Sequence, residues 1–198
     1  MKLNRLAVIA LTFLTFGIQA QQKETRTLEP FTNVVIKGRV ALHLVKSDSN
    51  SMTISMKNRF DLKDFTTEVR GNTLTMTYTK KHRKQHDPKV TVYLDYDRLD
   101  RLEMNGMVSV TASETITATR LQIHGDGMVK GDLDLVVSEL DVRLEGMCDM
   151  KLSGAAENAR LDVDGMGKVN ALGLKAHTFE QYSSGFAKIR MGSGTNDG

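Results

Sequence analysis

The chain has 198 residues, with 27 Lys and Arg against 24 Asp and Glu, and a single cysteine. A formal net charge of only +3 gives no general attraction to nucleic acid or to an anionic membrane, so neither is expected as a partner. One cysteine cannot build a disulfide framework, so packing and backbone hydrogen bonds must hold the fold together.

The first twenty residues have the layout of a secretory signal peptide. Lys2 and Arg5 precede an apolar run at residues 6–16, and the small-residue exit at residues 17–20 follows it. This run is shorter than the roughly twenty apolar residues that a transmembrane helix needs. We predict cleavage after Ala20, no transmembrane segment in the remaining chain, and export to the periplasm, the outer-membrane surface or the outside. A retained N-terminal anchor is the alternative.

Helix signals are almost absent after residue 20. Between residues 21 and 98, apolar residues recur at every second position, which is typical of β-strands with one buried face. These runs lie at residues 31–36, 39–45, 52–56, 72–78 and 90–94. The basic segment at residues 80–86 has no aromatic neighbours. We interpret it as a solvated hairpin loop rather than a patch for acidic polysaccharide or lipid headgroups.

From residue 99 to residue 192 the chain repeats five times around a central glycine. The repeat reads apolar, polar, Gly, any residue, variable residue, polar, apolar, and the spacings between glycines are 19, 21, 19 and 20. The central glycines are Gly106, Gly125, Gly146, Gly165 and Gly185. A period this short, with no helical half, predicts an all-β, parallel β-helix-like solenoid with rungs of about 20 residues. We expect one domain over residues 21–192 and a disordered tail at 193–198.

Stacked rungs align equivalent residues in columns, and the last apolar position of each repeat predicts a continuous buried stack. Its members are Val110, Val129, Met150, Val169 and Ile189. The glycine in each rung predicts a corner where φ is positive or where two backbones approach closely.

The segment Val163-Asp-Gly-Met-Gly-Lys-Val169 resembles the repeats of the auto-transporter adhesin head GIN domain family. The opening segment at residues 26–38, Arg-Thr-Leu-Glu-Pro-Phe-Thr-Asn-Val-Val-Ile-Lys-Gly, is also similar to that family. The resemblance covers residues 26–191 and implies a right-handed, β-helix-like domain in exported envelope proteins. It implies an adhesin function and supplies no catalytic residues. Relatives favour Ser after the central glycine, whereas this chain has mostly methionine there.

The residues that follow the central glycines form an apolar stripe. They are Met107, Met147, Met166 and Phe186, with Asp126 in the second repeat. If strand alternation continues through the glycine, these side chains point outward and suit a protein or glycan partner. If the glycine corner turns them inward, they are ordinary core residues. Exposure of the methionine side chains distinguishes the two interpretations.

The residues before the central glycines form a polar column that includes His124, Glu145 and Asp164. Stacked carboxylates could share a proton or a cation, which is the basis of an enzyme interpretation. A solvated sheet face needs the same polar residues, and no set of nucleophile, base and orienting group is legible. Cys148 with Met147 and Met150 would suit a soft metal, but neighbouring strand residues point to opposite faces. We predict no catalytic residue, metal or cofactor.

These observations favour an exported envelope or surface protein that acts as a non-catalytic, adhesin-type binding domain. A glycan or an envelope or surface protein is the expected partner. A β-helix polysaccharide hydrolase or lyase is the alternative, and a structural envelope element is a further one. Self-association through the open ends of the solenoid is expected, because unpaired strand edges can stack on another chain.

Overall fold

The computed structural model describes most of the chain, namely residues 21–57, 61–78 and 89–192. Three predicted features lie outside these residues: the signal peptide at 1–20, the basic segment at 80–86 and the tail at 193–198.

The described residues form eight strands and one short 3-10 helix. In chain order these are β1 (Gln21–Thr27), β2 (Asn33–Lys46), β3 (Ser51–Lys57), η1 (Leu62–Asp64), β4 (Phe65–Arg70), β5 (Thr73–Tyr78), β6 (Val90–Tyr96), β7 (Arg101–Ala112) and β8 (Ile116–Met191). The all-β prediction is confirmed. The alternating runs of residues 21–98 lie in β2, β3, β5 and β6, whereas β1 and β4 were not predicted.

Strand β2 connects the two halves of the sheet. One edge of β2 pairs with β7 in parallel from Asn33 to Leu44. The other edge pairs in parallel with β5 up to Lys37 and then with β6 from Val40. The remaining N-terminal pairings, β1 with β3, β3 with β6 and β4 with β5, are antiparallel. The sheet is therefore mixed, and the parallel β-helix-like arrangement predicted from the repeats does not describe this N-terminal half.

The antiparallel β4–β5 pair has a local cause. Gly71 lies in the turn between these strands with φ of +60°, a conformation that glycine adopts without steric cost. The short link returns the chain beside itself, which only an antiparallel pair allows.

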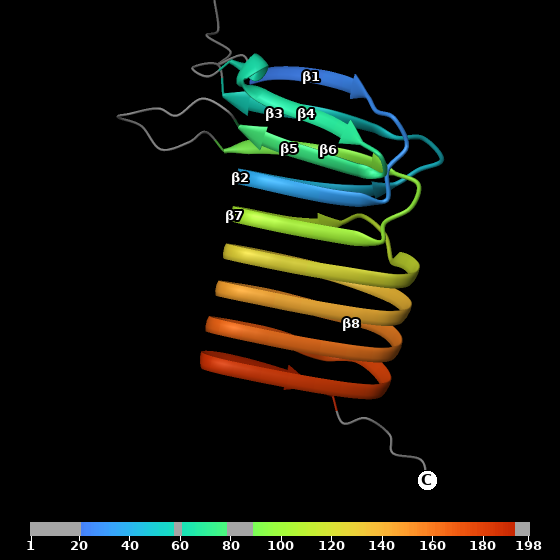
Figure 1. Cartoon of the computed structure of the whole chain (residues 1–198), viewed down its shortest axis with the longest axis vertical. Helices are drawn as coiled ribbons and strands as arrows, with labels where there is room; N and C mark the ends of the chain where they lie inside the picture. Colours follow the sequence, from blue (N-terminus) through green and yellow to red (C-terminus); the bar gives the residue numbers. More distant parts are fainter. Residues whose placement is uncertain (1–20, 58–60, 79–88, 193–198) are drawn as a thin grey trace, which may run out of the picture.

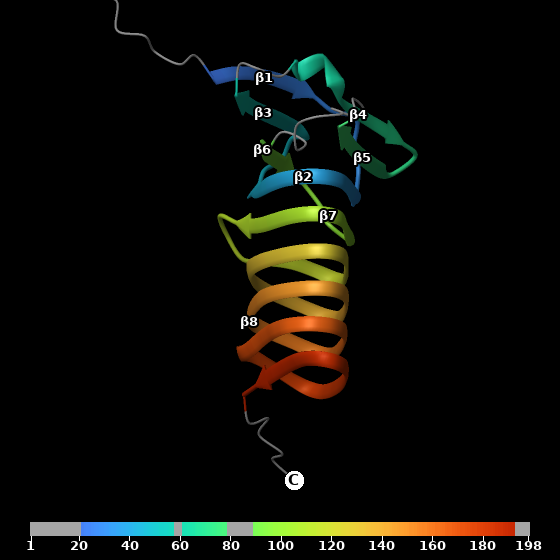
Figure 2. The same cartoon turned by 90° about the vertical axis from the view of Figure 1, so that its left-hand side faces the viewer.

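Strand β8 continues from β7 and is drawn as one ribbon that curves back on itself in successive turns (Figure 1). In the view turned by 90°, the turns of β8 are stacked in a column that begins next to β7 (Figure 2). The first turn of β8 pairs with β7 in parallel, from Gln122 opposite Arg101 to Asp132 opposite Thr111.

The core follows the strand alternation. Apolar side chains at every second position are buried and form one cluster that runs from Phe31 to Leu174. Among the described residues no polar or charged residue is buried as a whole, although single side-chain oxygens of Asn50 and Asp141 are. None of the helices in this part of the chain is long and apolar enough to cross a membrane.

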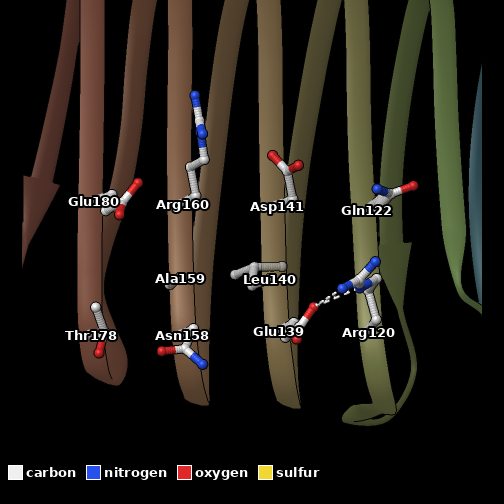
Figure 3. A pocket seen from close by; sticks show the side chains of 10 residues that line it. All are labelled: Arg120, Gln122, Glu139, Leu140, Asp141, Asn158, Ala159, Arg160, Thr178 and Glu180. Carbon is white, nitrogen blue, oxygen red and sulfur yellow. Dashed lines mark hydrogen bonds and ion pairs between the residues drawn. The ribbon is translucent and has the colours of Figure 1, made fainter.

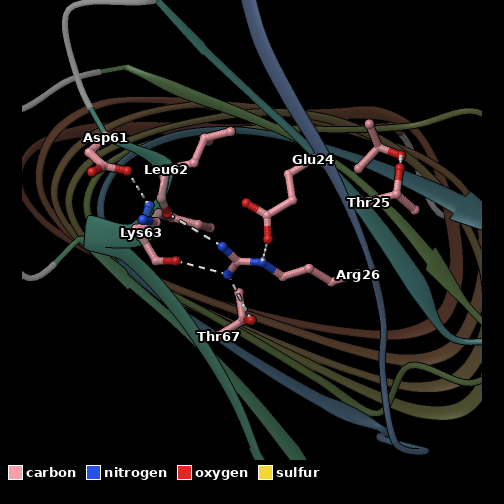
Figure 4. A network of polar contacts seen from close by, with 9 residues as sticks. Glu24, Thr25, Arg26, Asp61, Leu62, Lys63 and Thr67 are labelled. Atoms are coloured by element: carbon pink, nitrogen blue, oxygen red, sulfur yellow. Dashed lines mark hydrogen bonds and ion pairs between the residues drawn. The ribbon is translucent and has the colours of Figure 1, made fainter.

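Arg26 attaches β1 to the segment that contains η1 and β4 (Figure 4). Its guanidinium donates hydrogen bonds to the carbonyl oxygen of Phe65 at 2.8 Å and to the Thr67 hydroxyl at 3.0 Å. It also donates to Glu24 at 2.8 Å, and this hydrogen bond holds the pKa of Glu24 below its ordinary value. The network is structural, because each acceptor belongs to the protein itself.

Candidate functional site

The candidate site is built on a column of glycines that runs across β2, β7 and the successive turns of β8. A Cβ added to Gly106 would lie 2.6 Å from the carbonyl oxygen of Gly38, and one on Gly127 would lie 2.6 Å from that of Gly106. The same relation continues between successive glycines. The column contains Gly38, Gly106, Gly127, Gly146, Gly165 and Gly185, all with positive φ. These positions favour glycine for two reasons. A Cβ atom would come too close to the backbone of the neighbouring turn at every column position after Gly38, and residues with a side chain rarely adopt a positive φ.

The register of the second repeat differs from the prediction. Gly127, not Gly125, belongs to the column, and Gly125 lies opposite Met104 instead. A Cβ on Gly125 would meet the Leu144 side chain at 2.8 Å, so this glycine gives space to a core residue. The predicted buried stack changes accordingly. Gly131, not Val129, lies opposite Val110, and the side chain of Met150 fills the space beside it.

The residues that follow the column glycines form a line of exposed apolar side chains, which we name the methionine ladder. Its members are Met107, Met128, Met147, Met166 and Phe186. Their side chains are between 37% and 82% exposed, because strand alternation continues through the glycine. Met128 was missed owing to the wrong register, which placed Asp126 here. Among the described residues, the ladder supplies five of the nine exposed large hydrophobic side chains.

The polar column is only partly assembled as predicted. Glu145 and Asp164 directly precede column glycines, and Asp126 occupies the matching place in the second repeat. His124 lies opposite Glu103, so it belongs to a different column from the two carboxylates. Ser184 donates a 2.5 Å hydrogen bond to Asp164. The structure therefore does not gather the three residues, and no group of three His, Cys, Asp or Glu in the described ranges could hold a metal ion.

One end of the ladder has a shallow hollow of about 250 Å³. Met107 and Met128 line it with the buried Val40 and Val108. Its charged lining residues are Arg39, Lys89 and Lys130. None of these cations forms an ion pair with another described residue. The hollow thus joins apolar surface to positive charge.

A second concave surface, which we name the polar groove, lies elsewhere on β8 and has a volume of about 440 Å³ (Figure 3). One row of its side chains contains Arg120, Glu139, Asn158 and Thr178. A second row contains Gln122, Asp141, Arg160 and Glu180. Leu140 and Ala159 lie between the rows and are buried. The groove was not predicted from the sequence, because its residues are spread over four turns without a shared motif.

Cys148 is buried, and burial raises the pKa of its thiol, with a further contribution from the charge of Asp149. Met147 is exposed while Cys148 and Met150 are buried, so these three residues do not converge on one metal site.

The comparisons with known proteins agree with this architecture. The chain is similar to a putative adhesin from Bacteroides fragilis NCTC 9343, with a TM-score of 0.75 and 18% identity over 86% of this chain and 79% of that one. A putative adhesin from Parabacteroides merdae ATCC 43184 has a TM-score of 0.59 and 14% identity over 88% and 82% of the two chains. A putative lipid binding protein from Parabacteroides distasonis ATCC 8503 has a TM-score of 0.55 and 16% identity, over 88% of this chain and 95% of that one. These likenesses show a shared fold.

No curated protein matches the chain. A family model does match it, over residues 30–195, which is most of its length. The chain therefore belongs to the family described as putative auto-transporter adhesin, head GIN domain.

Proposed function

We propose that this chain is an adhesin-type binding domain of the cell envelope, without catalytic activity, and that the methionine ladder is its binding surface. The observation that carries the proposal is the alignment of five exposed apolar side chains along one line of the molecule. Family membership supports the adhesin assignment. The separation of His124 from Glu145 and Asp164 weakens the enzyme alternative.

We further propose that residues 99–192 form a right-handed β-solenoid with rungs of about 20 residues. Stacked glycines and the parallel register of β7 with β8 support this description. A solenoid presents the same position of each rung at a spacing of about 4.8 Å, so the ladder would be a regular, rigid array.

Export is part of the proposal. The layout of residues 1–20 supports cleavage after Ala20 and delivery to the periplasm, the outer-membrane surface or the outside. N-terminal sequencing of the protein recovered from the envelope tests this step, and a mature chain that begins at Gln21 is expected.

The chemistry of the ladder favours a protein partner. Thioether side chains are unbranched and polarizable, so they adapt to the shape of an opposing apolar surface. The hollow beside Met107 and Met128 adds Arg39, Lys89 and Lys130, which would attract carboxylates. The expected partner is an envelope or surface protein that presents apolar side chains next to Asp or Glu.

Matched double variants test the ladder. Met128→Gln with Met147→Gln removes two ladder side chains, while Val136→Gln with Leu172→Gln removes two comparably exposed apolar side chains elsewhere. We expect the ladder variant to lose at least about tenfold in affinity for isolated envelopes, since buried apolar anchors dominate interfaces. The control variant should bind as the unaltered protein does. Equal binding by both variants would contradict the proposal.

A further inference from the structure

The polar groove has properties of a ligand site that the ladder does not explain. Its two rows of polar side chains run across four successive turns of β8, with buried apolar residues between them (Figure 3). Adjacent paired strands are about 4.8 Å apart, so four turns give the groove a length of about 14 Å. An elongated ligand could therefore lie across the strands and contact each turn.

Several polar groups in the groove have no hydrogen-bond partner in the described part of the chain. The Oδ1 atom of Asp141 is buried and has no hydrogen-bond partner. The side chains of Gln122, Asn158, Thr178 and Glu180 make no hydrogen bond to another described residue. A buried acceptor without a partner carries a free-energy penalty. Because Asp141 as a residue is only half-buried, a rotation of its side chain toward the groove would let a ligand hydroxyl or amide donate to this oxygen and remove the penalty.

The two arginines of the groove are held in place by other contacts. Arg120 forms an ion pair with Glu139 on the next turn. The guanidinium carbon of Arg160 lies 5.0 Å from the centroid of the Tyr182 ring, a cation–π geometry. Because these cations are engaged, and because Asp141 and Glu180 add negative charge, the groove does not suit a polyanion such as nucleic acid.

The remaining ligand chemistry is defined by the mixture of donors and acceptors. Asn and Gln amides both donate and accept, carboxylates accept, and the Thr178 hydroxyl does both. Hydroxyl groups, which also donate and accept, pair with every member of this set. Because Leu140 and Ala159 between the rows are buried in the core, a ligand would meet the outward-facing polar side chains and the strand backbone. The groove offers no deep apolar pocket of the kind that anchors an aromatic or aliphatic peptide side chain.

We propose that the polar groove binds a neutral oligosaccharide that lies across the turns of β8, with Asp141 and Asn158 as its principal hydrogen-bonding residues. This site is separate from the methionine ladder, so the chain would carry a glycan surface and a protein surface at once.

Isothermal titration of the purified protein with defined hexasaccharides tests the proposal. The probes are maltohexaose, cellohexaose and mannohexaose, with hexagalacturonate as the acidic comparison and hexaglycine as the peptide comparison. At least one neutral hexasaccharide is expected to bind. Asn158→Ala and Asp141→Leu should each raise its Kd about fivefold or more, the loss expected for one hydrogen bond. Asn158→Ala changes an exposed side chain, so it keeps the test valid should Asp141→Leu fail to fold.

Two controls make the outcome specific to the groove. Asp126→Leu removes an exposed carboxylate beside the ladder and should leave the Kd unchanged. The ladder variant with Met128→Gln and Met147→Gln should also keep saccharide binding, so failure of either proposal is distinguishable from failure of the other. Absence of neutral saccharide binding at millimolar concentration would overturn the inference. Binding that Asn158→Ala leaves intact, or binding of hexagalacturonate or hexaglycine alone, would overturn it equally.

Discussion

Met107 lies directly beside Met128 in the parallel pairing of β7 with β8, and both side chains are exposed. Paired strands are about 4.8 Å apart, so the ladder from Met107 to Phe186 spans about 19 Å. Since alternation directs these side chains away from the core, they contribute little to packing. Packing of the core therefore does not account for their apolar character, and we attribute it to contact with a binding partner.

The glycine column makes a prediction about stability. In Gly127→Ala the new Cβ would lie 2.6 Å from the Gly106 carbonyl oxygen at φ of +107°. We expect a loss of about 3 kcal/mol in the free energy of unfolding, measured by chemical denaturation. Gly125→Ala should cost only about 1 kcal/mol, because the Leu144 side chain can move.

Gly38→Ala separates the two causes of the stability loss in Gly127→Ala, namely the steric clash and the backbone strain. Gly38 has φ of +120° but nothing within 4 Å of its added Cβ, so only backbone strain acts there. Its cost should fall below that of Gly127→Ala. A larger loss from Gly125→Ala than from Gly127→Ala would show that the column register is wrong.

Gly131 and Met150 should be energetically coupled. A Cβ on Gly131 would collide with the Met150 thioether, and Met150 is fully buried. Gly131→Ala overpacks this site, whereas Met150→Val leaves a cavity. The double variant should be more stable than the sum of the single losses by about 1 kcal/mol in a denaturation cycle. Strict additivity would mean that the two residues do not share this space.

Cys148 predicts a pH dependence above neutrality. Because burial raises the pKa of the thiol, its contribution to stability is complete below the ordinary value of 9.0 and is lost as pH rises through the folded-state pKa. The free energy of unfolding should therefore decrease above about pH 9. Cys148→Ala should reduce that slope but not remove it, since burial also raises the pKa of Tyr96 above 10.0. An unchanged slope in Cys148→Ala would contradict this assignment.

Arg26 predicts a local effect at the N-terminal end. Arg26→Ala removes hydrogen bonds to Phe65 and Thr67 that join β1 to β4. We expect a loss of about 2 kcal/mol and faster amide hydrogen exchange in these strands, with the turns of β8 unaffected. Glu68→Gln, which breaks an exposed ion pair with Arg70, is the control and should change neither measurement. Uniform acceleration of exchange throughout the chain would argue against a local role.

Much of the fold was predictable because period-two alternation and turn glycines report directly on strands. The all-β class and four of the N-terminal strands followed from that pattern. The register of the second repeat did not, since Gly125-Asp-Gly127 offers two glycines to one column and composition fits both. Packing against Leu144 distinguishes them, and that contact exists only in the folded chain.

The first member of the glycine column was also hidden. Gly38 pairs with Gly106, but the intervening residues form the β3 to β6 region and break the period of twenty. The candidate site was partly predictable for the same reason as the fold: four ladder residues follow from alternation, and Met128 required the correct register. The polar groove depends on side chains from four turns, which no local pattern connects.

The most direct test of the central claim places a photo-crosslinking amino acid at Met147 and, in a second protein, at Val136. Both positions are exposed, apolar and on β8, but only Met147 belongs to the ladder. On intact envelopes the Met147 probe should yield a discrete covalent adduct with a protein partner, and the Val136 probe should yield none. Equal adducts from both positions, or none from Met147, would contradict the assignment of the ladder as the binding surface.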